Sequence, residues 1–270
     1  MDFLDEPGGI WPFATLAGTF LALAGLELVI PRRERRQPVA RRWFANLGLF
    51  LIDTLAVRVL VPVLLIGMAA LAQERGWGLF NVLDLPWWSA FGLPLLVLDL
   101  AIYLQHWATH RIPVLWRMHR VHHTDRDFDV TTAARFHPFE IVLSMLYKLA
   151  VVAALGPPVL AVLVFEVLFN ALTVFTHSNI KMPGKADALI RKLLVTPDMH
   201  RVHHSTVECE TNSNYGTILS LWDRLFGTYR QDAEAGQGGV TFGLASYQDA
   251  RPNGLGWSLI LPFLSNKSRD

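Results

Sequence analysis

The 270-residue chain has one cysteine, Cys209, and charged residues make up only 17% of it. A single cysteine excludes a small secreted module held together by disulfides. Soluble domains usually contain about 25% charged residues, so the shortage of charge argues against an ordinary soluble fold. The formal net charge of +1 gives no reason to expect nucleic-acid binding, which needs a concentrated basic face. No low-complexity tract is present, which excludes a disordered or collagen-like chain and leaves a membrane protein.

Apolar residues make up 52% of the chain and gather in long runs. A helix needs roughly 20 apolar residues to cross a bilayer. The runs cover residues 10–30, 44–71, 87–104, 141–155 and 159–176. The tripeptide at 156–158, Gly-Pro-Pro, separates the last two runs because proline ends a helix. Residues 141–155 form a short run that either crosses at a tilt or re-enters, so we expect an all-α integral membrane protein with four to five transmembrane or re-entrant helices.

The arginines predict which side of the membrane each loop faces. Arginine-rich loops stay in the cytoplasm, and the loop after the first run contains Arg32, Arg33, Arg35, Arg36, Arg41 and Arg42. Counting crossings from this loop puts residues 105–140 and the chain after His177 on the same side. The acidic start of the chain argues against a secretory signal, so the first run is interpreted as a retained anchor. We therefore expect a multi-pass protein with a helical cap on the cytoplasmic side.

All ten histidines belong to that cap or its edge. They form one HxxxH pair and two HxxHH clusters, with two isolated residues. The pair is His106 and His110, the clusters are His119, His122, His123 and His200, His203, His204, and the isolated residues are His137 and His177. Spacings of three and four put side chains on one helical face. Two such imidazoles can chelate one metal, while the third can serve a second metal or brace the first, so all ten histidines are predicted metal ligands.

The number of histidines indicates more than one metal. Eight clustered histidines exceed the four ligands of a tetrahedral zinc site, whereas two metals with four or five imidazoles each fit the count. No HExxH motif and no Glu-x-x-His pair are present. Imidazole suits iron, copper, nickel and zinc alike, so the residues alone do not choose the metal.

Polar stripes on two of the apolar runs end at histidine. Asp99, Tyr103, His106 and His110 form one stripe, and Glu166, Asn170, Thr173 and His177 form the other. A carboxylate near a ligand histidine can accept its second N–H. Asp99 is predicted to do so, with a helix-packing hydrogen bond as the alternative, and Tyr103 is a further candidate for supporting the ligands.

Other polar residues have more local interpretations. Asp198 is expected either to orient a ligand or to cap a helix, and Asn214 and Tyr215 either hold the last cluster through hydrogen bonds or form a loop turn. Trp222 is interpreted as a packing residue and Asp223 as a surface or cap contact. In the second apolar run, Asp53 and Arg58 are interpreted as a structural pair or as snorkelling groups.

The arrangement resembles the superfamily of fatty acid hydroxylases and sterol desaturases, integral-membrane di-iron oxidoreductases rich in histidine. The segments that carry the resemblance are DLAIYLQHWATH at 99–110, MHRVHH at 118–123, TTAARFHPFE at 131–140, FTHSN at 175–179, TPDMHRVHHS at 196–205, NSNYG at 212–216 and LWDRLFGTY at 221–229. The resemblance implies two ferrous ions as cofactors, O2 as oxidant and a lipid as substrate. It also implies an N-terminal anchor region at 1–90, a catalytic domain at 91–230 and a cytoplasmic tail at 231–270.

The resulting functional hypothesis is hydroxylation of an unactivated C–H bond of a lipid. Desaturation at the same site is the alternative within the class. A membrane metal-binding or transport protein and a catalytically silent scaffold are the alternatives of other classes. No GxGxxG dinucleotide fingerprint is present, so the electrons are expected from an external ferredoxin or reductase docking on the basic face.

Overall fold

The computed structural model describes residues 10–264. Within this range the chain is all-helical, which confirms the predicted fold class, and five of its segments are long and apolar enough to cross a membrane. The long helices are α1 (Ile10–Val29), α2 (Val39–Leu60), α5 (Trp87–Arg111), α7 (Pro138–Leu155) and α8 (Val159–Thr176). The acidic start, on which the argument against a secretory signal depended, lies outside the described residues.

Three prolines and a glycine set where the apolar runs break. The second run was predicted as one stretch, but α2 ends at Leu60 and the chain resumes as α3 (Leu65–Arg75). Val61, which precedes Pro62, has the extended backbone that a following proline favours. At the predicted Gly-Pro-Pro turn, α7 ends at Leu155 and Gly156 adopts φ 59°, a left-handed conformation that glycine accepts without strain.

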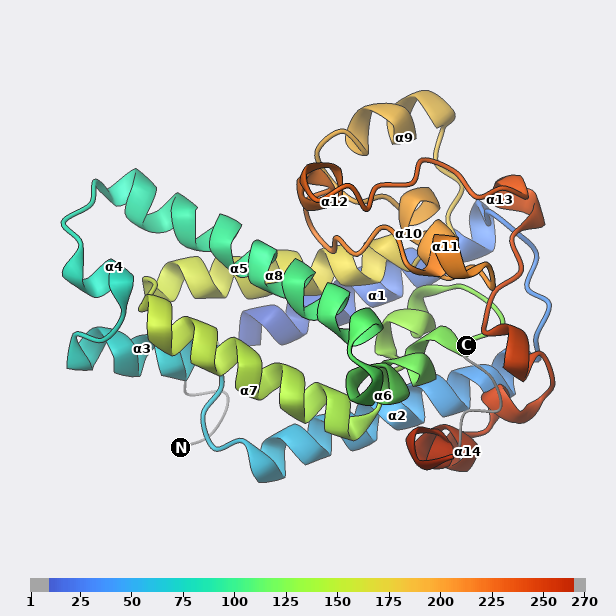
Figure 1. Ribbon diagram of the computed structural model, residues 1–270, viewed down its shortest axis with the longest axis horizontal. Helices are drawn as coiled ribbons and strands as arrows, with labels where there is room; N and C mark the ends of the chain where they lie inside the picture. Colours follow the sequence, from blue (N-terminus) through green and yellow to red (C-terminus); the bar gives the residue numbers. More distant parts are fainter. Residues whose placement is uncertain (1–9, 265–270) are drawn as a thin grey trace.

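The long helices form a bundle along the long axis of the molecule (Figure 1). Helix α1 packs against α8, α2 and α3 pack against α7, and α5 contacts both α7 and α8. Side chains such as Val57, Ile102, Val152 and Phe165 fill the interior of the bundle. Many apolar side chains instead face outward, as Val59 does at 80% exposure, and such an outer surface suits contact with lipid.

Short helices form a cap at one end of the bundle, on the right in Figure 1. They are α6 (Pro113–His123), η1 (Val130–Ala134), α9 (Gly184–Ile190), α10 (Pro197–His203), α11 (Glu208–Thr211), α12 (Leu221–Leu225), α13 (Gly236–Gly239), η2 (Ala245–Tyr247), η3 (Arg251–Asn253), α14 (Leu255–Ile260) and η4 (Leu261–Phe263). The small helix α4 (Leu79–Val82) lies with α3 at the opposite end. The C-terminal segment packs back onto the cap, where Leu244 and Leu261 join Leu49 of α2 and Val121 of α6 in one buried cluster.

A buried ionic network joins α2 to the cap. Arg42, 1% exposed, donates to the carboxylates of Asp125 and Asp129, and Asn46 donates to Asp125 and Thr131. Burial alone would raise the pKa of Asp129, but the charge and hydrogen bonds of Arg42 outweigh it and hold that pKa well below its usual range. The network fixes the loop that follows α6, which carries three of the histidines.

Candidate metal centre

Five histidines converge at the junction of α5, α6 and α10. Their ligand nitrogens all lie within 4.8 Å of one another. This five-histidine group consists of His106 and His110 from α5, His119 and His123 from α6, and His203 from α10. Residues far apart in sequence meet here because α5 runs directly into α6 and α10 packs beside them.

A four-histidine group lies next to the first. It consists of His122 from α6, His177 at the end of α8, and His200 and His204 from the α10 region. The Nε2 atom of His177 is 3.0 Å from that of His200 and 3.2 Å from that of His122. Two nitrogens bound at right angles to one ion, each at about 2.1 Å, would lie about 3 Å apart, so this spacing suits a shared metal.

Each HxxHH cluster is divided between the two groups. In α6 the first and last histidines, His119 and His123, belong to the five-histidine group, while His122 belongs to the other. The α10 cluster is divided the opposite way, with only His203 in the five-histidine group. The groups adjoin, because the rings of His123 and His204 are 4.7 Å apart between centroids.

Hydrogen bonds on the far side of the rings orient several of these histidines. In the five-histidine group, His106 Nδ1 lies 2.8 Å from Tyr215 O, His203 Nδ1 lies 2.6 Å from Ser213 O and His119 Nδ1 lies 2.6 Å from a Glu140 oxygen. Carbonyl and carboxylate oxygens only accept hydrogen bonds, so each of these Nδ1 atoms carries the hydrogen. The opposite nitrogen, Nε2, is left with a free lone pair for a metal.

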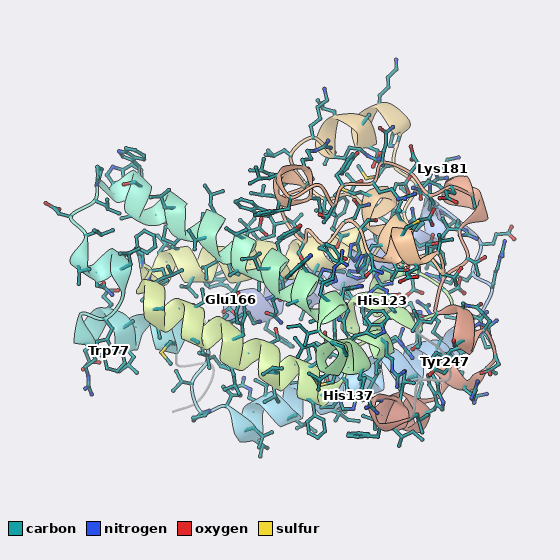
Figure 2. The ribbon with its side chains drawn as sticks, viewed as in Figure 1. Trp77, His123, His137, Glu166, Lys181 and Tyr247 are labelled. Atoms are coloured by element: carbon teal, nitrogen blue, oxygen red, sulfur yellow. The ribbon has the colours of Figure 1, made fainter. Side chains whose placement is uncertain are left out.

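The same arrangement holds in the four-histidine group. His177 Nδ1 donates to Thr173 O at 2.8 Å, and His122 Nδ1 donates to Arg135 O at 3.1 Å. Thr173 belongs to the polar stripe predicted on α8, although its contribution is a backbone carbonyl. Glu166, from the same stripe, lies to the left of His123 in Figure 2, farther along the bundle and away from the histidines.

Six of the nine metal-facing nitrogens are buried without a hydrogen-bond partner. The Nε2 atoms of all five histidines in the first group, and of His204 in the second, have no hydrogen-bond partner. Buried polar atoms are nearly always satisfied, so such a convergent set requires an explanation. Metal ions at both groups would satisfy these nitrogens, and the residues therefore fit two ions held by neutral imidazoles.

Burial also keeps the rings neutral, as metal binding requires. Desolvation lowers the pKa of His203 to about 3 and that of His177 to about 4. It also lowers the pKa of His122, His200 and His204 well below the usual value, and neighbouring histidines add to the effect. A neutral imidazole offers its lone pair to a metal without first losing a proton.

One of the predicted ligands, His137, is not brought into either group. It caps the N-terminus of α7, where its Nδ1 accepts from Phe139 N and its Nε2 lies 3.1 Å from Leu259 O. Figure 2 shows His137 at that helix end, apart from His123. The isolated His177, by contrast, lies inside the four-histidine group.

Asp99 forms the packing hydrogen bonds that were its alternative role, and the Tyr103 hydroxyl contacts a threonine instead of a histidine. Asp99 contacts no histidine ring; its Oδ2 accepts from Trp222 Nε1 at 2.8 Å and from Leu219 N. The Tyr103 hydroxyl contacts Thr228 Oγ1 at 2.9 Å. Both residues therefore connect α5 to the segment after α11. That segment packs against the part of α5 that precedes His106.

Asp223, interpreted from sequence as a surface or cap contact, is fully buried. Its two carboxylate oxygens accept from the backbone N–H groups of Tyr215 and Gly216 and from the Thr228 hydroxyl. The surface interpretation is therefore wrong, because this carboxylate satisfies a tight turn inside the cap. Through that turn Asp223 positions the Tyr215 carbonyl, which accepts from His106.

Two further predicted residues support α10. Asp198 neither caps the helix, a role that Thr196 takes, nor contacts a histidine; it pairs with Arg32 and Arg201. Asn214 has φ 52° and donates to Met199 O, beside His200. In the second apolar run, Asp53 is buried and Arg58 is exposed.

Sequence reasoning missed Glu140, which takes the role predicted for Asp99. It lies at the end of the segment TTAARFHPFE, so its place in that motif was the available signal. The backbone acceptors from Ser213 and Arg135 have no sequence signal at all, since any residue supplies a carbonyl.

The fold and site define a multi-pass membrane protein whose cap presents two adjoining histidine groups. The sequence model of the fatty acid hydroxylase family matches residues 91–228. The chain belongs to this family, within the superfamily of fatty acid hydroxylases and sterol desaturases.

Several characterised proteins resemble the chain. It is 31% identical over 176 residues to an alkylglycerol monooxygenase of Danio rerio, which covers 64% of this chain and 38% of the relative. It is 28% identical over 233 residues to the alkylglycerol monooxygenase of Xenopus tropicalis, covering 85% and 50%. It is 32% identical over 138 residues to the ornithine lipid hydroxylase OlsE of Rhizobium tropici, covering 51% and 40%. The chain thus spans half the length of these relatives or less, and no solved structure matches it.

Proposed function

We propose that the protein is an O2-dependent, non-haem di-iron enzyme that hydroxylates a C–H bond of a lipid. The observation that carries the proposal is the pair of adjoining histidine groups, in which six of the nine Nε2 atoms are buried without a hydrogen-bond partner. The relatives named as lipid hydroxylases and monooxygenases support the same reaction class.

The chain's own residues would hold iron as neutral imidazole ligands. When bound, the two ferrous ions would supply oxygen activation, in which a C–H bond, O2, two electrons and two protons give an alcohol and water. Glu140 and the carbonyls of Tyr215 and Ser213 would keep the Nδ1 hydrogens in place, so that each Nε2 faces its metal.

Aromatic side chains would keep water away from this centre. Phe136 stacks on the His122 ring at 4.4 Å between centroids, and Trp116 lies 4.9 Å from the His110 ring. Phe128 meets the His204 ring edge-on, with 5.1 Å between centroids. Exclusion of water favours oxidation of the substrate over side reactions.

The substrate class follows from the surroundings of the five-histidine group. His106 and His110 are the least buried members of the two groups, and they lie on α5, one of the five membrane-length helices. Exposed Trp107 and Ile112 flank them. We propose that a lipid chain reaches the centre from the bilayer along this part of α5, with the cap and its centre on the cytoplasmic side.

The division into an anchor region (1–90), a catalytic domain (91–230) and a C-terminal segment (231–270) is part of the same proposal. The family match and the histidine groups support the middle part as catalytic. The Arg42 network and the packing of Leu261 indicate that the flanking parts stabilise it.

The test is iron content and product analysis of the full chain purified without oxygen. We expect about two iron ions per chain, and one 18O atom in the lipid product when 18O2 is supplied with a chemical reductant. A product that has lost two hydrogens and gained no oxygen would instead identify a desaturase. A folded sample that binds no iron and forms no product would favour a scaffold.

A further inference from the structure

A pocket rich in arginine lies on the cap, beside the four-histidine group. Its walls include Arg33 and Arg36 from the loop after α1, Arg126 from the loop after α6, and the apolar residues Val240 and Phe242. One acidic residue, Asp127, is also present, and its carboxylate accepts from the backbone N–H groups of Arg36 and Gln37. We call this site the basic pocket.

The arginines of the basic pocket are held close together. Arg33 donates to Val240 O and its guanidinium lies 4.8 Å from the centre of the Phe242 ring. Burial and the charges of Arg36 and Arg32 lower the pKa of Arg33, while Asp127 opposes the effect. Arg126 donates to Asp249 O but its Nε has no partner, and Arg36 is exposed. The pocket is therefore a concentrated positive site that suits an anionic partner.

A stack of aromatic rings leads from this pocket to the four-histidine group. Phe242 stacks on Phe128 with 5.5 Å between ring centroids. Phe128 stacks on His177 at 5.7 Å and meets the His204 ring edge-on at 5.1 Å. Phe242 and Phe128 belong to one buried apolar cluster. Only two rings thus separate the pocket from the predicted ligands.

We propose that the basic pocket is the docking site of an acidic, one-electron carrier protein, and that Phe242 and Phe128 shorten the path of its electrons to the four-histidine group. This inference rests on the proposed function, because that reaction consumes two electrons for each O2. The carrier is oxidised twice per turnover, and its electrons, with two protons from water, complete the formation of alcohol and water.

Position and charge both favour this partner over a lipid. The loop that joins α1 to α2, and helix α13, lie at the ends of the long apolar helices, on the side of the molecule opposite the α7–α8 turn (Figure 1). Opposite charges steer electron-carrier proteins into short-lived complexes. Electron tunnelling weakens steeply with distance, so a carrier gains from docking where the path to the metal is shortest.

Binding is tested with the iron-loaded full chain in detergent and an acidic plant-type [2Fe–2S] ferredoxin as the probe. We expect binding that weakens with added salt, and a dissociation constant raised about tenfold or more by Arg36→Glu. Arg36 is a suitable position because its side chain is exposed. The matched control is Lys185→Glu with Lys192→Glu, which changes exposed charges at α9 on another side of the cap.

The electron path has a separate test, the rate at which reduced ferredoxin is oxidised by the loaded protein. Phe128→Leu should slow this rate, expressed per bound iron, several-fold while leaving the dissociation constant of ferredoxin unchanged, because Phe128 does not line the basic pocket. Wild-type protein given a chemical reductant tests the proposed function independently, since no carrier is needed. If that reaction gives product but ferredoxin binds Arg36→Glu as tightly as wild type, the docking site is wrong. Ferredoxin binding that does not weaken with salt would also overturn the proposed docking site. So would inorganic phosphate that binds in the pocket without changing the affinity for ferredoxin.

Discussion

His177 and His200 face each other across 3.0 Å between their Nε2 atoms, although one ends α8 and the other begins the last histidine cluster. In their neutral forms His177 and His122 donate their Nδ1 hydrogens to backbone carbonyls, so their bare Nε2 lone pairs, 3.2 Å apart, would repel each other unless a cation lay between them. A metal shared with His122 and His204 accounts for the contact. His177, which is isolated in the sequence, is therefore one of the four histidines of this group.

The division of the histidines predicts how metal content responds to substitution. His200→Gln should remove metal from the four-histidine group and lower iron from about two to about one per chain. His110→Gln should do the same at the five-histidine group. Elemental analysis of anaerobically purified protein measures both. The control is His137→Gln, which weakens the N-cap of α7 but should keep two ions. Loss of iron in that variant would return His137 to the ligand set.

The Glu140–His119 hydrogen bond predicts that metal affinity depends on the charge of Glu140, which is not itself a ligand. Glu140→Ala removes the acceptor of His119 Nδ1, and partners of this kind are typically worth about 10- to 100-fold in metal affinity. Glu140→Gln, which keeps an acceptor without the charge, should lose less. Competition with a chelator measures the affinity, and Glu208→Ala, an exposed change on α11, is the control. Equal affinity in all three variants would contradict the role assigned to Glu140.

The buried histidines predict that acid destabilises the iron-free protein. Unfolded histidine has a pKa of about 6.5, whereas burial lowers that of His177 to about 4 and that of His203 to about 3 in the fold. Between these values the unfolded chain binds protons that the folded chain does not, so stability must fall as pH decreases from about 6.5 toward 4. Denaturant unfolding in detergent at several pH values measures how the free energy of unfolding changes with pH. His203→Gln should make the loss of stability toward acid smaller. Stability that increases as the pH falls would refute the role of the buried histidines.

The buried Arg42 network predicts a large loss of stability when one partner is removed. Arg42→Ala removes the buried cation that Asp125 and Asp129 share and leaves Asp129 with Arg35 at 3.3 Å; removing one partner of a buried ion pair costs about 3–5 kcal/mol. Thermal or denaturant unfolding in detergent measures the difference. Arg41→Ala removes a neighbouring arginine that is exposed, and it should change stability by less than about 0.5 kcal/mol.

Cys209 offers a direct test of membrane orientation. It is the only cysteine, it is exposed, and it belongs to α11 of the cap. A thiol reagent that cannot cross membranes should label it in inverted vesicles but not in intact cells or spheroplasts. Labelling from the outside instead would show that the cap faces away from the cytoplasm, against the arginine distribution.

Patterns within single segments predicted much of the fold. The five apolar runs became five membrane-length segments, and Gly156 with its two prolines ended α7 as expected. Length, hydropathy and helix-breaking residues act over a few neighbouring positions, so they can be recognised without tertiary structure. Pro62 broke the second run by the same local mechanism, so that break can also be predicted from the sequence.

The sequence by itself determined that this is a helical membrane protein with enough clustered histidines for two metals. Tertiary structure alone decided which histidines share a group, that His177 joins and His137 does not, and that Glu140 rather than Asp99 supports a ring. Helical spacing specifies which side chains share a face, but not what that face meets. The hydrogen-bond partners of α6 and α10 lie up to 166 positions away in the sequence, and only the packing of those distant segments sets these bonds.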